Sequence, residues 1–260
     1  MSRFMGKTIW ITGAQTPIGK AVALRCAAEG ANLLLSGVST PPEGLCLGEW
    51  QSCSCYADNP LTEADAAQAL ALVSHLDILV TANRKVKALS ILEAEAEDFD
   101  DIIDENLTSV FIAARAAAGK IGRGNKGAIV FIGSIHGDKP TGATFLHSVA
   151  NGGLNMLTKE AALDLGRSGI RVNLLRAGPT EGDDAVFTSE LSGIYHDVES
   201  KIPRSTPATA QEIAAAALML CADDASFING AILTADGGFV SHYMDADMDT
   251  RWATGFGGER

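Results

Sequence analysis

The sequence predicts an α/β fold in which a doubly wound parallel sheet is flanked by helices. Two observations predict it. Apolar, strand-like runs alternate with helical patterns from residue 7 to residue 234, and the first strand leads into a glycine-bearing turn over residues 13–19. Alternation of this kind builds parallel sheets through right-handed crossovers. No linker or repeat interrupts it, so we expect a single domain over residues 1–238 and a tail over residues 239–260.

Strands are expected where short apolar runs lie between turn residues. These runs cover residues 7–12, 31–35, 76–82, 128–132, 170–175 and 231–234. The run over residues 76–82 is almost continuously apolar, as expected for a strand that is covered on both faces.

Helices are expected between these strands, where apolar residues recur at helical spacing or alanine dominates. The helical segments cover residues 20–30, 61–74, 93–120, 147–166 and 210–221. Residues 39–59 contain prolines, glycines and three cysteines and are predicted to be irregular. Residues 180–207 are predicted to form a long loop, of the kind that covers an active site.

Composition excludes several classes of partner. The formal net charge of −12 argues against binding to nucleic acid or to an anionic membrane surface. No apolar run is long enough to span a membrane, and the N-terminus leads into a strand without an apolar signal region, so a cytoplasmic protein is expected. The five cysteines are odd in number and include no CxxC pair, so we expect free thiols and no metal site.

The turn Thr12-Gly13-Ala14-Gln15-Thr16-Pro17-Ile18-Gly19 is a candidate dinucleotide site. Glycines in such a turn let the backbone approach a pyrophosphate, and the following helix N-terminus supplies amide donors. Gly13, Ile18 and Gly19 are therefore the candidate cofactor-binding residues of a Rossmann-like fold. Ser134 follows the strand run 128–132, at the sheet edge where open α/β sheets bind ligands.

These motifs together resemble the short-chain dehydrogenase/reductase family. The resemblance covers nearly the whole chain and rests on the order of the glycine turn, the segment ENLTSVF around Asn106, the run Gly169 to Asn173 before Gly178-Pro179, and Asp236-Gly237-Gly238. It implies that an enzyme of this kind oxidises a secondary alcohol or reduces a ketone with NAD or NADP. It also implies that Asn106 and Ser134 belong to the catalytic site and that Asp58 meets the adenine.

The chain departs from the family at two catalytic positions. In the family, the strand-end serine is followed thirteen residues later by a proton-donating tyrosine and four residues after that by a lysine. This chain has His147 and Asn151 there. Imidazole exchanges protons near neutral pH, so His147 is the candidate substitute. Asn151 cannot supply the charge of lysine, and we favour the interpretation that His147 no longer serves catalysis.

The dinucleotide site also departs from the family. Pro17 replaces the middle glycine of the turn, and Ser36-Gly37-Val38 offers neither the acidic residue of an NAD site nor the basic residue of an NADP site. Arg84 stands where the family has a glycine beside the adenine ribose. Its side chain could turn outward, as part of a basic loop with Lys85 and Lys87. Alternatively, it could turn inward, where it would fill the nucleotide cleft or bind a phosphate. We therefore expect this chain to bind no cofactor, with NAD or NADP held by a partner subunit.

The leading hypothesis is a catalytically degenerate subunit that supports an active, paralogous NAD(P)-dependent subunit in a hetero-oligomer, expected to be a tetramer. It resembles heteromeric dehydrogenases with one cofactor-less subunit, such as those acting on hydroxybenzylsuccinyl-CoA, so a CoA ester is a candidate substrate. Alanine-rich faces of residues 93–120, 147–166 and 210–234 are the expected contact surfaces. Two alternatives stay open: a self-sufficient enzyme using Ser134, Asn106 and His147, and a ligand-binding regulatory protein.

Overall fold

The protein is described by a computed structural model, which places all residues except 1, 60–61, 141–143, 184–200 and 242–260. Most of the tail 239–260 and the middle of the loop 180–207 therefore lie outside the described residues. The described chain forms a seven-stranded sheet in the order β3-β2-β1-β4-β5-β6-β7, and every neighbouring pair is parallel. The predicted doubly wound α/β fold is confirmed.

The strands follow the predicted apolar runs closely. They are β1 (Thr8–Thr12), β2 (Asn32–Ser36), β3 (Cys53–Tyr56), β4 (Ile78–Thr81), β5 (Gly127–Ser134), β6 (Ile170–Ala177) and β7 (Ile232–Ala235). The chain runs outward from β1 to β3 and then returns to β4 on the other side of β1. This reversal creates the switch point at which open α/β sheets bind ligands.

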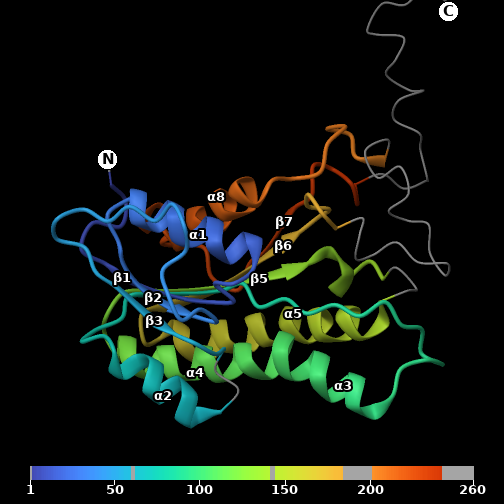
Figure 1. The fold of residues 1–260 in the computed structure, drawn as a ribbon, viewed down its shortest axis with the longest axis horizontal. Helices are drawn as coiled ribbons and strands as arrows, with labels where there is room; N and C mark the ends of the chain where they lie inside the picture. The colour runs from blue at the N-terminus through green and yellow to red at the C-terminus, as the bar shows by residue number, and fades with distance from the viewer. Residues whose placement is uncertain (1, 60–61, 141–143, 184–200, 242–260) are drawn as a thin grey trace, which may run out of the picture.

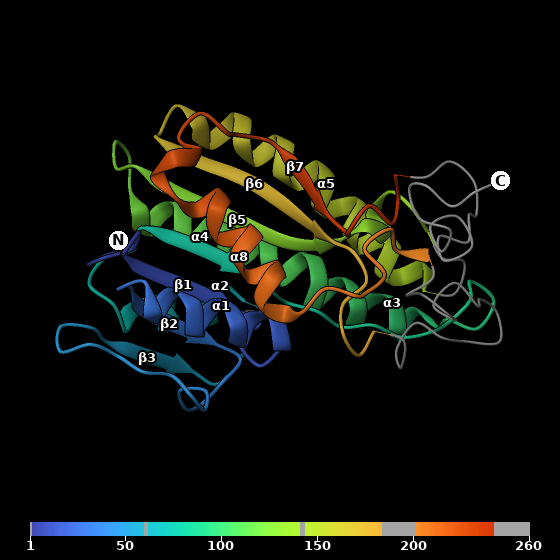
Figure 2. The same ribbon diagram turned by 90° about the horizontal axis from the view of Figure 1, so that it is seen from above.

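Helices cover both faces of the sheet (Figures 1 and 2). On one face lie α1 (Pro17–Ala28) and α8 (Ala210–Cys221), and on the other lie α2 (Glu63–Ala71), α3 (Ala96–Ile103), α4 (Ser109–Ile121) and α5 (Phe145–Gly166). Strand alternation divides the core accordingly: Ile9 and Ile11 pack beneath α1 and α8, whereas Trp10 packs among the residues of α2 and α4.

Two predictions differ from the structure. The single helix predicted over residues 93–120 is α3 and α4 joined by a π-helical turn, Asp104–Thr108, which contains Asn106. Such turns occur frequently at functional sites. The prediction that residues 39–59 are irregular is wrong at β3. Its residues, CSCY, are only partly buried at the sheet edge, and serine interrupts them, so they show no apolar run.

Short 3₁₀ turns follow β5 and α8, over Ile135–Gly137 and Asp223–Ala225. No helix among the described residues is both long and apolar enough to cross a membrane. The same residues hold no group of three or more His, Cys, Asp or Glu side chains placed to bind a metal ion.

Candidate active site

A cavity of about 350 Å³ opens at the carboxyl ends of the central strands, beside the first turn of α1. Residues Asn106, Ser134 and His147 all line it, and so does Asn151. The structure therefore brings the three predicted catalytic residues to one place. They arrive there from the π-helical turn, the end of β5 and the first turns of α5.

His147 is buried and contacts Asn151 and the backbone of Lys85. Its side chain is buried, as is that of Asn151 one helical turn later. The Asn151 Nδ2 atom donates to the His147 carbonyl oxygen at 2.9 Å and lies 3.2 Å from the ring Nε2. The ring also hydrogen-bonds to the backbone of Lys85. The imidazole is therefore engaged by the protein itself.

Burial decides the charge of His147. Loss of solvent lowers its pKa to about 3, and electrostatic interactions, first with Arg84 and then with His136, act in the same direction. The ring is consequently neutral at physiological pH. With a pKa near 3, only about one molecule in ten thousand would carry the imidazolium proton at pH 7.

Asn151 also fixes Ser134. Its Oδ1 atom accepts the Ser134 backbone N–H at 2.7 Å, and the Ser134 hydroxyl accepts the His136 backbone N–H at 3.2 Å. The Asn151 side chain thus accepts a hydrogen bond from β5 through its oxygen and donates one within α5 through its nitrogen. It ties the two elements together where the family places a charged lysine.

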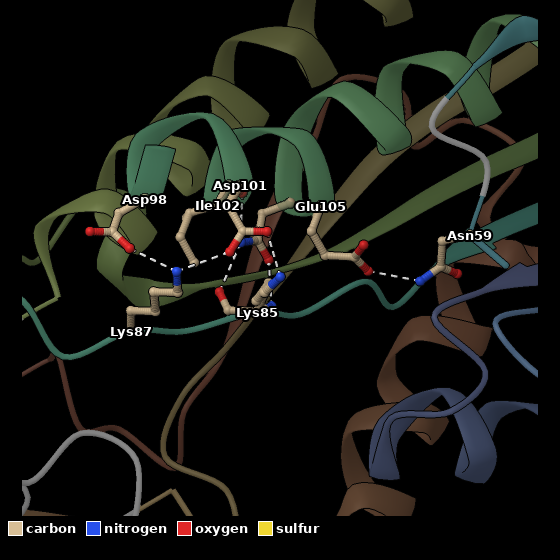
Figure 3. A network of polar contacts seen from close by, with 8 residues as sticks. Asn59, Lys85, Lys87, Asp98, Asp101, Ile102 and Glu105 are labelled. Carbon is tan, nitrogen blue, oxygen red and sulfur yellow. Dashed lines mark hydrogen bonds and ion pairs between the residues drawn. The ribbon is translucent and has the colours of Figure 1, made fainter. Parts of the chain in front are cut away.

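Asn106 holds the loop that follows β4. Its Oδ1 accepts the Lys85 N–H at 2.9 Å, and its Nδ2 donates to the carbonyl oxygens of Lys85 and Ile102 at 2.8 and 2.9 Å. Figure 3 shows that the same loop is fixed by ion pairs: Lys85 with Asp101, and Lys87 with Asp98. The side chain of Asn106 therefore both lines the cavity and holds the loop after β4 in place.

Arg84 turns into the cavity, unlike Lys85 and Lys87. Its guanidinium pairs with Asp183, whose side chain is only 6% exposed. The other Asp183 oxygen accepts from the Thr180 N–H and hydroxyl at 2.8 and 2.7 Å. This pair connects the end of β4 to the loop after β6. Sequence reasoning missed Asp183, although its position shortly after Gly178-Pro179 marks the loop that approaches the site.

The glycine turn has the tight geometry that the sequence predicts. Gly13 has a φ of +70°, and a Cβ there would lie 2.4 Å from the Ala82 carbonyl carbon. A Cβ on Gly19 would lie 2.1 Å from the Gly13 oxygen. Only glycine allows β1, β4 and α1 to approach so closely.

The first turn of α1 offers donors to an anion. The Thr16 hydroxyl caps the helix by accepting the Gly19 N–H at 3.0 Å, and Pro17, at the first helical position, has no N–H to satisfy. The amide of Ile18 lies in this first turn, where no intrahelical acceptor exists, and Ile18 and Lys20 both line the cavity. An amide, a helix N-terminus and a cation fit a pyrophosphate.

Asp58, which the resemblance assigns to the adenine, and its neighbour Asn59 follow β3 at the adenosine end of the site. Asp58 is exposed and lies outside the cavity lining, and its carbonyl oxygen accepts the Gly37 N–H at 3.2 Å. The next residue, Asn59, reaches the turn: its Oδ1 accepts the Gly13 N–H at 2.8 Å. Its Nδ2 donates to Glu105 at 2.7 Å.

A glycine turn and an amide-lined cavity at the switch point of a doubly wound sheet define a dinucleotide-binding class of protein. A family described as Enoyl-(Acyl carrier protein) reductase matches residues 13–240. Glucose 1-dehydrogenase 2 of Bacillus subtilis is 31% identical over 247 residues, which are 90% of this chain and 95% of that protein. The 3-oxoacyl-[acyl-carrier-protein] reductase FabG of Escherichia coli is 30% identical over 90% of this chain and 98% of its own length.

Solved structures agree with these matches. A dehydrogenase/reductase from Sinorhizobium meliloti superposes with a TM-score of 0.80 at 28% identity, over 92% of this chain and 97% of the other. The chain belongs to the short-chain dehydrogenase/reductase family of oxidoreductases.

Family membership corrects one expectation. We expected this chain to bind no nicotinamide cofactor, because Pro17 and Arg84 depart from the family pattern. That expectation is wrong: members of this family bind NAD(P) within the same chain, and the match begins at Gly13 and includes the whole site. The geometry agrees with the correction. Pro17 leaves the Ile18 amide in place, and Arg84 is drawn toward Asp183 with the cavity still open.

Proposed function

We propose that this chain is a dinucleotide-binding but catalytically degenerate subunit, which supports an active, paralogous NAD(P)-dependent dehydrogenase in a hetero-oligomer. The observation that carries the proposal is the state of His147. It is the residue at the tyrosine position, and burial lowers its pKa to about 3. The cofactor, when bound, supplies or receives the hydride, and the residues of this chain would have to move the accompanying proton.

Ketone reduction requires an acid that holds a proton at the working pH. The most effective acids and bases have pKa values close to that pH. An imidazole with a pKa near 3 is almost never protonated at pH 7, and as a base it is too weak to accept a hydroxyl proton. Asn151 adds no charge that would compensate. Binding without proton transfer is the expected result.

Exposed apolar side chains support the assembly part of the proposal. Phe111 on α4 is 46% exposed, and Met156 and Leu163 on α5 are 56% and 74% exposed. Near the end of α8, Met219 is 49% exposed, and Phe227 is fully exposed. Exposed apolar side chains on α4 and α5, and separately at α8 on the other face of the sheet, favour contact with other subunits.

Co-expression tests the proposal. The chain would be produced alone and with a paralogous dehydrogenase from the same genome, and oxidation of CoA esters of secondary alcohols would be followed by NADH formation. We expect no turnover by the chain alone, and higher turnover by the pair than by the paralogue alone. Turnover by the isolated chain equal to that of the pair would refute the proposal.

A matched pair of surface variants locates the contact. Leu163→Arg places a charge on the exposed face of α5 and should abolish co-purification of the two subunits. Leu72→Arg changes another exposed leucine, 48% exposed at the end of α2, and should leave co-purification intact. Equal behaviour of the two variants would argue against assembly through α5.

A ligand-binding regulatory role is a second candidate. A relative from Escherichia coli named cyclic-di-GMP-binding biofilm dispersal mediator protein is 26% identical over 92% of this chain. Titration of the chain with NADH, NADPH and cyclic di-GMP, followed by intrinsic fluorescence, distinguishes the two candidates. Tight binding of the cyclic dinucleotide with no effect on a partner dehydrogenase would favour the regulatory role.

A further inference from the structure

Glu105 is a half-buried carboxylate at the adenosine end of the site, contributed by the π-helical turn before Asn106. One of its oxygens accepts from the Asn59 Nδ2 at 2.7 Å and from the Asn83 Nδ2 at 3.3 Å. Figure 3 shows Glu105 directed at Asn59, away from the lysine–aspartate pairs on the same segment. The two amides hold its charge in one place.

Asn59 connects this charge to the dinucleotide turn. Its Oδ1 accepts the Gly13 N–H at 2.8 Å, and the same oxygen lies 3.0 Å from where a Cβ on Gly37 would stand. Gly37 follows β2, and the end of the second strand is where such folds recognise the adenosine ribose. Glu105 is therefore separated from the ribose position by a single amide side chain.

Arg84, the cation nearest to the expected ribose position, lines the cavity but is already paired with Asp183. Gln15 lies directly against Gly37, since its Oε1 would be 2.0 Å from a Cβ there, and it is neutral. Asp58 adds a second carboxylate at the end of β3. Lys85, whose charge acts on Glu105, is itself paired with Asp101.

We infer that Glu105, held by Asn59, makes this chain select NAD(H) over NADP(H). The 2′-phosphate of NADP(H) would place negative charge one amide side chain away from a fixed carboxylate, whereas the free ribose hydroxyls of NAD(H) can donate to the amide oxygens. This inference rests on the dinucleotide binding that the proposed function contains. On this inference, the preference for NAD(H) comes from Glu105 in the π-helical turn, because the segment Ser36-Gly37-Val38 carries no charge.

Direct binding measurements test the inference. The full chain would be titrated with NADH and with NADPH at pH 8, because burial raises the pKa of Glu105 and the carboxylate must be ionised. We expect NADH to bind about tenfold more tightly at low salt, with a smaller ratio at high salt, where exposed charges are screened. Glu105→Gln keeps the side-chain shape and should strengthen NADPH binding about fivefold, with little change for NADH.

Two further variants keep the test decisive. Asp104→Asn removes the neighbouring exposed carboxylate of the same turn and should leave the ratio unchanged. Gln15→Lys places a cation against Gly37 on an exposed residue, so it tests the ribose position even if Glu105→Gln fails to fold. It should strengthen NADPH binding about tenfold.

Several outcomes would overturn the inference: no binding of either dinucleotide, equal or tighter binding of NADPH, or a ratio that Glu105→Gln and Asp104→Asn change alike. The ratio of the NADH and NADPH affinities tests the selectivity of Glu105 independently of the proposed subunit role. A chain that turned over substrate alone and still preferred NADH would refute the subunit role and leave the selectivity of Glu105 standing.

Discussion

The catalytic corner (Ser134, His147 and Asn151) and the glycine turn (residues 13–19) lie at the same edge of the sheet but are organised in opposite ways. In the catalytic corner, polar groups bind one another: Asn151 joins the backbone of Ser134 to that of His147. In the glycine turn, the Thr16 cap satisfies Gly19, and the Ile18 amide stays available beside the cavity. The catalytic corner and the glycine turn thus rest on separate sets of contacts.

The difference arises from side chains alone. The backbone of α5 continues unbroken through His147 and Asn151, so the family's architecture is kept where the reacting groups are replaced. The glycine turn, by contrast, is set by backbone contacts between β1, β4 and α1. Two side chains of the family pattern are replaced without moving the α5 backbone, whereas a Cβ at Gly13 or Gly19 would meet backbone atoms of neighbouring segments.

The largest expected effect comes from restoring the catalytic corner. The double variant His147→Tyr/Asn151→Lys supplies the proton donor and the helper charge that the family uses. We expect its rate of NADH-dependent ketone reduction to exceed that of the original chain by about a thousandfold, as positioned acid–base groups typically contribute. The measurement is a steady-state assay of NADH oxidation with a panel of ketones.

Single variants serve as controls for this restoration. His147→Tyr alone and Asn151→Lys alone should each remain far below the double variant, because the two side chains act as a unit. An original chain as fast as the double variant would mean that the catalytic corner is functional as it stands.

The second effect concerns the glycine turn. Gly13→Ala places a Cβ within 2.5 Å of the Ala82 and Asn83 backbone at a φ of +70°. We expect it to lower the free energy of unfolding by about 3 kcal/mol, since strain and a backbone clash add. Urea denaturation measures this change.

Gly6→Ala separates the two causes. Gly6 has a similar φ of +74°, but a Cβ there meets no atom within 4 Å. Gly6→Ala should lower the free energy of unfolding by only about 1 kcal/mol, because only the positive φ disfavours alanine there. Similar losses for both variants would show that the close approach of β1 and β4 is not what fixes glycine at residue 13.

Sequence patterns predicted the fold well, because burial leaves a signal in each element. The last helix was predicted over residues 210–221 and is observed over Ala210–Cys221. The apolar run before Ser134 identified β5, and from β5 the position of the site followed. β3 escaped prediction because its sequence, CSCY, contains no apolar run, whereas the equally half-buried edge strand β7, ILTA, contains one.

The site was predicted where the resemblance to the family assigns its motifs to positions along the chain. Asn106, Ser134 and His147 were expected to meet and do. The pairing of Arg84 with Asp183 spans 99 residues of sequence, and that of Asn59 with Glu105 spans 46. Contacts of this range depend on side-chain directions after folding, which no local pattern encodes. For the same reason, the sequence did not reveal that Arg84 pairs with Asp183, and Arg84 was counted against cofactor binding.

The third effect is a pH dependence of stability to which His147 of the catalytic corner should make the main contribution. His147 titrates near pH 6.5 when unfolded but near pH 3 when folded, so below pH 6.5 the unfolded state binds a proton that the folded state refuses. Stability is therefore full above pH 6.5 and falls as the pH drops toward 3. The loss between pH 8 and pH 5 should be about 2 kcal/mol.

Denaturation of matched variants at both pH values isolates this contribution. His136, whose pKa burial also lowers, adds a loss in the same direction. His147→Gln should reduce the loss by about 2 kcal/mol, whereas His75→Gln, at an exposed side chain, should not change it. An unaltered loss in His147→Gln would mean that the imidazole is not kept neutral by burial.

The smallest effect compares two helix caps of the same type. Thr16 caps α1, and its hydroxyl also donates to the Gly13 carbonyl at 2.8 Å; Thr209 caps α8 by accepting the Glu212 N–H at 3.2 Å. Thr16→Ala and Thr209→Ala should each lower the free energy of unfolding by about 1 kcal/mol, since each leaves a helix amide without its acceptor. Only Thr16→Ala should also weaken NADH binding several-fold, and Thr16→Ser should restore it. Equal NADH affinities in the two alanine variants would show that the cap of α1 stabilises the helix without positioning the amides that meet the dinucleotide.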